Sequence, residues 1–221
     1  MKIAIIAAMS KELALLLPLL ENHSTVSINN YTFHLGQIAG REIVAFQSGI
    51  GKVNSAIGTL TVIENFHPSL IINTGVAGGC GRARILDVVI PDRIAYHDVW
   101  CGEGTIPGQA ADCPPTFSCP LSADLVDSLG AKRGLLASGD TFISRREEVD
   151  RIVGMYPDCV AIDMESAAIA HTCYLKNVPF VAIRVVSDTP GAGDNIAQYD
   201  NFWADAPAST FHTLKSLLSA L

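Results

Sequence analysis

Apolar and polar residues along this chain alternate in blocks that predict strands and helices in turn. Lys2–Ala8 is a short apolar run typical of a buried strand, and Lys11–Leu20 follows with helical spacing. Between residues 26 and 47, short alternating segments separated by turns predict a meander of strands. A helix is then expected from Lys52 to about Phe66, and another buried strand over Leu70–Asn73.

The most informative stretch runs from residue 159 to residue 188. Cys159–Ile162 is a short apolar run, and from Met164 to Lys176 the apolar residues recur at steps of three and four, which is the period of a helix. Phe180–Val186 is rich in β-branched residues and predicts a strand buried on both faces, apart from Arg184. The order of these segments predicts strand, helix and strand.

Carboxylates occur where the predicted strands end. Glu165 and Asp188 each lie just past the carboxyl end of a predicted strand, and Glu12 lies in the first turn of the helix after the first strand. Open α/β sheets bind ligands at this edge. Because neither a metal cluster nor a nucleophile motif occurs, acids at the strand ends predict acid–base chemistry on a small ligand. For Glu12 the local pattern leaves a second interpretation open, in which the acid only complements its helix dipole.

Two glycine-containing segments follow predicted strands. Ser48–Lys52 (SGIGK) opens a helix, and its backbone amides could hold an anion, although tight packing of a strand against a helix explains the same glycines. Thr74–Gly79 (TGVAGG) is expected to be a loop. Its small residues either let a ligand approach the backbone closely or serve packing alone.

The segment 99–120 is the least regular part of the chain. Its length exceeds that of a normal connector, so we expect it to be functional or to pack on a partner. His97 stands just before it, beside Asp98. A histidine beside an acid is either catalytic or, more commonly, a structural hydrogen-bonding group. The segment 190–200 is expected to be a loop with the character of a lid, followed by a final helix over Asn201–Leu221 that is broken around Pro207.

The composition limits the kinds of partner. The chain of 221 residues carries a formal net charge of −7, is 49% hydrophobic and is only 17% charged. A single domain over residues 1–221 is the expectation for this length. Because binding to a nucleic-acid backbone needs a positive patch and no block of Lys or Arg occurs, no nucleic-acid partner is expected. The high apolar fraction leaves apolar surface to bury, most simply in an oligomer.

The lengths of the apolar runs and the spacing of the cysteines bear on the expected location of the protein. The first apolar run is too short for a signal peptide, and no window approaches about eighteen uninterrupted apolar residues. The six cysteines show no CxxC pair and no spacing of paired metal ligands. We therefore expect reduced cysteines and a cytoplasmic protein with no membrane partner, no bound metal and no cofactor.

Several segments together resemble the bacterial 5′-methylthioadenosine/S-adenosylhomocysteine nucleosidases, which belong to the nucleoside phosphorylase superfamily. The resemblance covers essentially the whole chain, in order and at compatible spacings. It implies an α/β fold, a three-layer α/β/α sandwich with a mixed twisted central sheet of the phosphorylase/hydrolase kind, assembled as a homodimer. The segments are AAMSKE (Ala7–Glu12), SGIGKVNSA (Ser48–Ala56), NTGVAGG (Asn73–Gly79), YHDV (Tyr96–Val99), SGDTFI (Ser138–Ile143), DMESAAIAH (Asp163–His171) and RVVSD (Arg184–Asp188).

The resemblance also implies irreversible hydrolysis of the N-glycosidic bond of an adenine nucleoside, without a metal. Carried over position by position, Glu12 would be the general base on the attacking water and Asp188 the general acid towards N7 of adenine. Ser187 would stand beside Asp188. The other implied positions bind substrate or water: Glu165 and Met164 at the ribose hydroxyls, Phe142 stacked on adenine, Ile143 at its edge through the backbone, Ala77 and Gly78 along sugar and base, Arg184 at the water, and Met9 and Val76 in the same site.

The chemistry of such a reaction agrees with the residue types. Cleavage of a C–N glycosidic bond needs a protonated leaving group and a water on the opposite face, so an acid and a base must be separated by the substrate. Asp188 must be protonated near neutral pH to act as the acid, so its pKa should lie well above the usual value of about 3.9. Apolar neighbours such as Phe180, Val185 and Val186 favour this shift.

Two positions depart from the commoner family pattern. Asp163 stands where Glu is commoner, which shortens the side chain by one methylene, and Val76 stands where Ser is frequent, which removes a hydroxyl near the water. The segment 99–120 departs as well, and in the family it faces the alkylthio pocket of the neighbouring subunit. Acceptance of large 5′ groups is left open by these departures.

Three other functions remain compatible with the sequence. A purine nucleoside phosphorylase of the same fold would need an anion site where the nucleosidase holds water, and the carboxylate of Glu12 would repel phosphate there. A futalosine-type nucleoside hydrolase would use the same fold and chemistry. A nucleoside-binding module without activity belongs to a different class, and the presence of all three carboxylates disfavours it.

Overall fold

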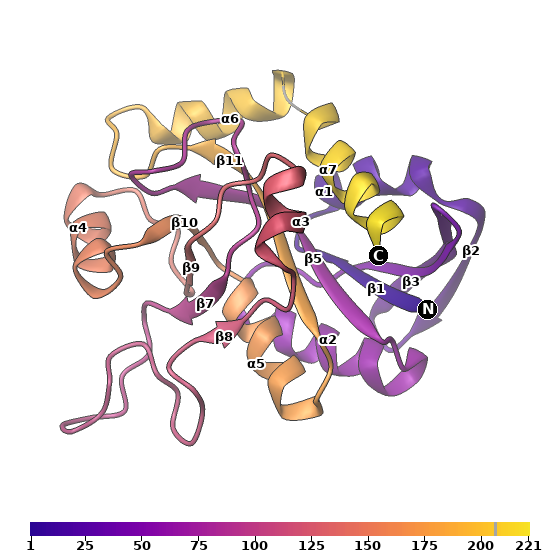
Figure 1. Ribbon diagram of the computed structural model, residues 1–221, viewed down its shortest axis with the longest axis horizontal. Coiled ribbons are helices and arrows are strands. Elements are labelled where there is room, and N and C mark those ends of the chain that lie inside the picture. The colour runs from indigo at the N-terminus through magenta and orange to yellow at the C-terminus, as the bar shows by residue number, and fades with distance from the viewer. Residues whose placement is uncertain (206) are drawn as a thin grey trace.

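The computed structural model describes residues 1–205 and 207–221, with side chains outside 204–211. A mixed sheet forms the centre of the molecule, and helices cover both of its faces (Figure 1). This is the α/β architecture that the sequence predicts. Of the helices in the described residues, none combines the length and the apolar composition needed to cross a bilayer.

The described strands join into one 11-stranded sheet. Its order is β2-β3-β4-β1-β5-β10-β9-β7-β8, with β11 beside β5 and β6 beside β11. β1 pairs in parallel with β4 and β5, and β5 pairs in parallel with β11 but antiparallel with β10. The strands are β1 (Lys2–Ala7), β2 (Glu21–Ile28), β3 (Tyr31–Ile38), β4 (Arg41–Gln47), β5 (Leu70–Gly79), β6 (Val88–Val89), β7 (Arg93–Tyr96), β8 (Phe117–Ser118), β9 (Leu135–Ser138), β10 (Cys159–Asp163) and β11 (Phe180–Asp188).

Two apolar clusters lie on opposite faces of the sheet. Because side chains alternate along a strand, Ala4 and Ile6 of β1 join one cluster and Ile3 and Ile5 join the other. The first cluster contains residues of α2 and α5, and the second contains residues of α1 and α7. The helices are α1 (Ser10–Leu16), the 3-10 turn η1 (Leu17–Leu19), α2 (Lys52–Phe66), α3 (Ala123–Ser128), α4 (Arg146–Met155), α5 (Ser166–Lys176), α6 (Asn195–Asp205) and α7 (Pro207–Ala220).

The sequence predicted a loop over Thr74–Gly79, and this prediction is wrong. The segment forms the second half of strand β5. It pairs with β11 up to Gly78 and with β10 at Gly78 and Gly79, so its backbone groups are hydrogen-bonded. Sheet pairing outweighs the low strand propensity of glycine here. The small residues are still required, because a Cβ at Gly78 would meet the ring of Pro190.

The helices near the two ends of the chain also differ from expectation. α1 stops at Leu16 rather than Leu20, and Pro18, which lacks a backbone N–H, lies in the 3-10 turn that follows. α6 begins at Asn195, inside the segment expected to be a loop. The break expected around Pro207 falls beside residue 206, which lies outside the described residues.

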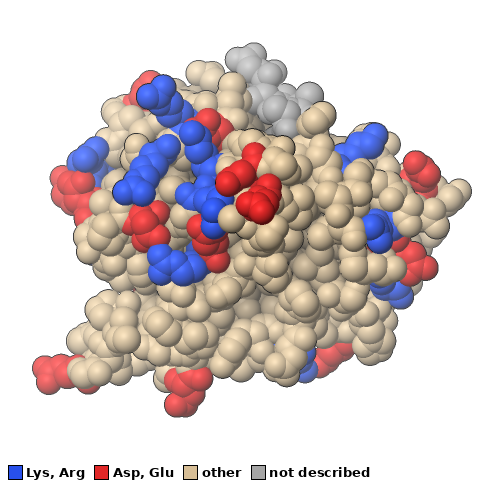
Figure 2. Space-filling model, in the orientation of Figure 1, with Lys and Arg blue, Asp and Glu red and all other residues tan. Residues whose placement is uncertain are grey.

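Charged side chains are unevenly spread over the surface. They gather in the upper left of the view, from α4 to α3, and few occur in the lower half, over α5 and the connection from β7 to β8 (Figure 2). Large apolar side chains are exposed on α2, where Val53 and Ile57 keep 67% and 53% of their surface. Trp100 and Ile106, in the β7–β8 connection, keep 66% and 55%. These apolar positions are available to pack on a partner.

Candidate active site

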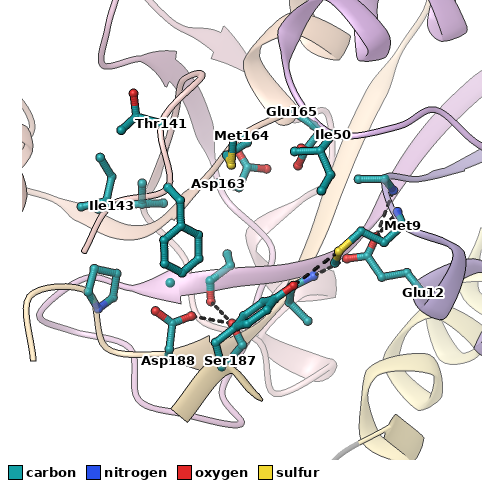
Figure 3. Close-up of a pocket in the computed structure, with 18 residues that line it drawn as sticks. Met9, Glu12, Ile50, Thr141, Ile143, Asp163, Met164, Glu165, Ser187 and Asp188 are labelled. Atoms are coloured by element: carbon teal, nitrogen blue, oxygen red, sulfur yellow. Dashed lines mark hydrogen bonds between the residues drawn. The ribbon is translucent and has the colours of Figure 1, made fainter. Parts of the chain in front are cut away.

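A cavity lies where β1, β5, β10 and β11 end. Acidic, apolar and aromatic side chains from separate parts of the chain surround it (Figure 3). All the predicted site residues except Arg184 line it. The lining residues are Ala8, Met9, Glu12, Ile50, Val76, Ala77, Gly78, Thr141, Phe142, Ile143, Ile162, Asp163, Met164, Glu165, Ser187, Asp188, Pro190 and Tyr199.

Glu12 is held at the junction of β1, α1 and β5. Its Oε2 accepts hydrogen bonds of 2.9 Å from the backbone amides of both Ala8 and Met9, and its Oε1 accepts one of 3.1 Å from the amide of Val76. Only 4% of the residue is exposed. Burial raises the pKa of Glu12, while the charge of Arg184 and the three amides oppose that rise. The carboxylate is therefore fixed in direction and surrounded by donors that favour its ionised form.

Asp188 ends β11 on another side of the same cavity (Figure 3). The hydroxyl of Ser187 lies 2.7 Å from Oδ1 of Asp188 and donates to it. Burial raises the pKa of Asp188, and the hydrogen bond from Ser187 opposes that rise. A buried carboxyl with a raised pKa is suited to donate a proton near neutral pH.

Glu165 is the residue just before α5. Its Oε1 accepts a hydrogen bond of 3.0 Å from the amide of Gly51, at the start of α2. Burial and the neighbouring charge of Asp163 raise the pKa of Glu165 to about 7, against the opposing effect of Arg184. Glu165 therefore lies on the cavity wall with a proton that it can hold or release near neutral pH.

The glycine-rich turn before α2 binds the protein's own carboxylates. Besides the bond from Gly51 to Glu165, the amide of Lys52 donates to Oδ1 of Asp140 at 2.7 Å. These two amides are the groups that an anion at the start of this helix would use. Internal carboxylates thus occupy the positions considered for an anion in the segment Ser48–Lys52.

Arg184 lies behind the cavity wall rather than on it. Its residue exposure is 1%, and its Nε and Nη2 donate to Oδ2 of Asp163 at 2.9 and 2.7 Å. Nη1 donates to the carbonyl of Asn73 at 3.1 Å, and Nη2 also donates to the hydroxyl of Ser166 at 2.9 Å. These N–H groups point at protein atoms, so a contact of Arg184 with the water stays a prediction. Asp163, which stands where Glu is commoner in the family, accepts the hydrogen bonds of the Arg184 guanidinium.

Tyr199 is the main cavity residue that the sequence argument missed. It comes from α6, in a segment expected to be a loop. The hydroxyl of Tyr199 donates to Sδ of Met9 at 3.4 Å, and the ring meets that of Phe142 edge-on at a centroid distance of 5.8 Å. The recurrence of aromatic residues at Tyr199, Phe202 and Trp203 was the available signal for a helix packed on this site.

His97 does not make the side-chain hydrogen bond expected for a histidine beside an acid. The residue is 1% exposed, and neither ring nitrogen has a partner among the described residues. Burial lowers the pKa of His97, which favours the neutral ring. His97 is not among the residues that line the cavity.

Within residues 1–205 and 207–221, no group of His, Cys, Asp or Glu side chains is arranged to hold a metal ion. All six cysteines are free thiols. The polar groups that face the cavity are thus mainly carboxyls and backbone amides.

The arrangement separates an acid from a base. Asp188 approaches the cavity from the end of β11 and Glu12 from the first turn of α1, with Glu165 on a further side (Figure 3). A ligand between them would receive a proton from a carboxyl of raised pKa on one side and meet an amide-bound carboxylate on another. Phe142, Ile143 and Met164 supply apolar surface for a flat ring and a sugar.

Comparisons with known proteins identify the family of the chain. Residues 2–219 match the family described as the phosphorylase superfamily. The 5′-methylthioadenosine/S-adenosylhomocysteine nucleosidase of Neisseria meningitidis, in complex with methylthio-immucillin-A, is 34% identical with a TM-score of 0.92, over 100% of this chain and 99% of that one. The S-adenosylhomocysteine nucleosidase of Streptococcus pyogenes, in complex with 5-methylthiotubericidin, is 34% identical with a TM-score of 0.93, over 100% and 97%.

A third similar structure contains the free base. The 5′-methylthioadenosine/S-adenosylhomocysteine nucleosidase of Colwellia psychrerythraea, in complex with adenine, is 33% identical with a TM-score of 0.93, over 100% of this chain and 96% of that one. Fold and length therefore agree with one family throughout. The chain belongs to the phosphorylase superfamily, and its fold is that of the methylthioadenosine/S-adenosylhomocysteine nucleosidases.

Proposed function

We propose that the protein hydrolyses the N-glycosidic bond of 5′-methylthioadenosine and/or S-adenosylhomocysteine, releasing adenine and the 5-thioribose product. The observation that carries the proposal is the placement of Glu12. Its carboxylate is tied to the amides of Ala8, Met9 and Val76 in the same cavity as the protonatable carboxyl of Asp188. An acid and a base that face one ligand are what hydrolysis of a C–N glycoside needs.

In the proposed reaction Asp188 donates its proton to N7 of adenine while the C1′–N9 bond breaks and its electrons move onto the base. Positive charge develops on the ribose, and Glu165, next to it, binds the ribose hydroxyls and stabilises that charge. Glu12 takes a proton from a water whose oxygen forms the new bond to C1′. Glu12 then releases its proton to solvent and Asp188 takes one up, which restores both groups for another turnover.

The remaining cavity residues take roles in binding. Phe142 stacks on adenine, the backbone of Ile143 binds its edge, and Ser187 orients the carboxyl of Asp188 by the bond of 2.7 Å. Ala77 and Gly78 lie along the sugar and the base, and Met164 packs on the ribose. Met9 and Val76 complete the wall next to Glu12.

The placement of Glu12 also supports hydrolysis over phosphorolysis. A phosphate would need the backbone amides that now bind the Glu12 carboxylate, and it would be repelled by that charge. The amides at the start of α2 are likewise engaged, by Glu165 and Asp140. Water, which is neutral and small, fits beside such a carboxylate.

The proposal includes the assembly and the setting of the protein. We infer a single domain over residues 1–221, since the family match spans residues 2–219. A homodimer is supported by the exposed apolar side chains of Val53 and Ile57 on α2 and of Trp100 and Ile106 in the connection from β7 to β8. The free cysteines are compatible with a cytoplasmic location. Light scattering on the purified protein distinguishes a dimer from a monomer.

The assay that tests the proposal measures adenine released from 5′-methylthioadenosine in buffer without phosphate. We expect release by the wild type and a loss of about 10²-fold or more in Asp188→Asn, which cannot donate the proton. Asp150→Asn, at an exposed position of α4, is the control and should keep full activity. Obligatory phosphate, with a ribose-1-phosphate product, would contradict hydrolysis. Release of the free base from inosine and from futalosine analogues, each measured for its own base, tests the alternative substrates.

A further inference from the structure

Tyr199 reaches along the cavity from its Phe142 end to its Met9 end. The two rings of Tyr199 and Phe142 meet edge-on, with an interplanar angle of 74°. The hydroxyl, at the far end of the same ring, donates to Sδ of Met9 at 3.4 Å. Burial raises the pKa of the Tyr199 hydroxyl, which favours its protonated, hydrogen-donating form.

The position of Tyr199 is fixed by contacts between α6 and α1. Nζ of Lys11 lies 4.8 Å from the ring centroid of Tyr199 and 4.0 Å from that of Trp203, which are distances of cation–π contact. Lys11 is the neighbour of Glu12 in α1. The helix that bears the hydroxyl is therefore attached to the helix that bears the amide-bound carboxylate, and the hydroxyl has a defined direction.

The Met9 end of the cavity is otherwise apolar. Met9, Ile50 and Val76 line it, and the nearby carboxylate of Glu12 is directed at backbone amides. The present acceptor of the Tyr199 hydroxyl is a thioether, which is a weak hydrogen-bond acceptor. A ligand atom that accepts more strongly would gain that hydrogen bond at little cost to the protein.

The direction of the substrate follows from the proposed function, on which this inference rests. With the base at Asp188 and Phe142 and the ribose hydroxyls at Glu165, the 5′ carbon points towards Met9 and Ile50. We propose that the hydroxyl of Tyr199 determines specificity at the 5′ position. It donates a hydrogen bond to the 5′ substituent and favours adenine nucleosides with an acceptor there, such as a 5′ oxygen, over those with a 5′ alkyl group.

The test compares adenosine, which has a 5′ oxygen, with 5′-deoxyadenosine, which has a methyl group in its place. We expect the ratio of their kcat/KM values to fall about tenfold in Tyr199→Phe, because one hydrogen bond is lost from one substrate alone. Tyr31→Phe removes a hydroxyl from β3, outside this cavity, and is expected to leave the ratio at its wild-type value. A ratio that stays within twofold of wild type in Tyr199→Phe would overturn the proposal.

A binding measurement separates failure of this inference from failure of the proposed function. The dissociation constants of both nucleosides are measured by calorimetry in Asp188→Asn and in the double variant with Tyr199→Phe. Hydrolysis itself is tested with 5′-methylthioadenosine, and if wild-type protein releases no adenine from it, the proposed function is wrong while the ratio of dissociation constants still tests Tyr199. Loss of the preference for adenosine in the double variant supports the proposal, and an unchanged preference refutes it.

Discussion

The amide of Gly51 donates a hydrogen bond of 3.0 Å to Oε1 of Glu165, joining the start of α2 to the turn before α5. This single bond lies in a buried region where the charges of Asp163 and Arg184 also act on Glu165. Burial and the charge of Asp163 outweigh this bond and the charge of Arg184, so the pKa of Glu165 is about 7 in the folded protein, against 4.5 as the ordinary value.

Stability should therefore depend on pH through Glu165. Between about pH 4.5 and 7 the carboxyl of Glu165 is ionised in the unfolded chain but still protonated in the folded protein. The contribution of Glu165 to the free energy of unfolding therefore falls as pH rises through this range. Glu165→Gln removes that decline. The free energy of unfolding of Glu165→Gln minus that of wild type should be larger at about pH 8 than at about pH 5, as urea denaturation at both values would show. The same difference at both pH values would contradict the raised pKa.

Gly75 is expected to be indispensable for the position of Glu12. A Cβ at residue 75 would collide with Oε1 of Glu12, so Gly75→Ala must move the carboxylate away from the amide of Val76. We expect kcat/KM for adenine release to fall by about 10²-fold, the contribution of a positioned base. Gly154→Ala, in α4 with open space around its Cβ, is the matched control and should keep full activity. Equal activity of the two variants would exclude this role.

The pair Asp163–Arg184 should be worth far more to stability than a pair at the surface. Both side chains are 1% exposed. Arg184→Met leaves Asp163 as an unpaired buried charge, and we expect a loss of about 3–5 kcal/mol in the free energy of unfolding. In Arg146→Met, which breaks the exposed pair with Asp150, the loss should stay below about 1 kcal/mol. Denaturant titration measures both, and similar losses would show that the buried network is not structural.

Arg184 should also affect how kcat/KM depends on pH. Its charge lowers the pKa of Glu12, so Arg184→Lys, which keeps the charge, and Arg184→Met, which removes it, are expected to differ. In Arg184→Met the acidic limb of kcat/KM should move to higher pH, because Glu12 must be ionised to accept a proton. An acidic limb that stays in place in a folded Arg184→Met would show that this charge does not reach Glu12.

Removal of the Ser187 hydroxyl should move the other limb of the profile. The hydrogen bond from Ser187 lowers the pKa of Asp188, so Ser187→Ala lets that pKa rise further. Asp188 must be protonated to act as the acid, and activity is lost as pH rises through its pKa. The basic limb of kcat/KM is therefore expected at higher pH in Ser187→Ala. A shift to lower pH would mean that Asp188 is not the titrating acid.

The sequence predicted the acids of the site well, because each follows a strand whose apolar pattern is clear. Glu12, Glu165 and Asp188 come to one cavity since their strands meet there, and strand ends are readable from periodicity. The direction of a side chain is not readable in this way. Arg184 interrupts an apolar strand, but its burial against Asp163 and Asn73 depends on pairings between strands distant in sequence.

Tyr199 and the strand character of Thr74–Gly79 were missed for related reasons. Tyr199 lies after Pro190 and Gly191, which indicate a loop, and its helix is fixed by packing on α1 and β11 rather than by its own pattern. Glycines in β5 suppress the local strand signal, while β11 and β10 supply the hydrogen bonds. Tertiary contacts decided both cases.

The most direct test of the central account is the origin of the oxygen at C1 of the sugar product. The reaction with 5′-methylthioadenosine is run in heavy-oxygen water, with and without phosphate, and the products are analysed by mass spectrometry. If Glu12 activates water opposite Asp188, the sugar carries one heavy oxygen at C1, and phosphate changes neither the rate nor the product. A phosphate ester at C1, or a rate that requires phosphate, would contradict the account.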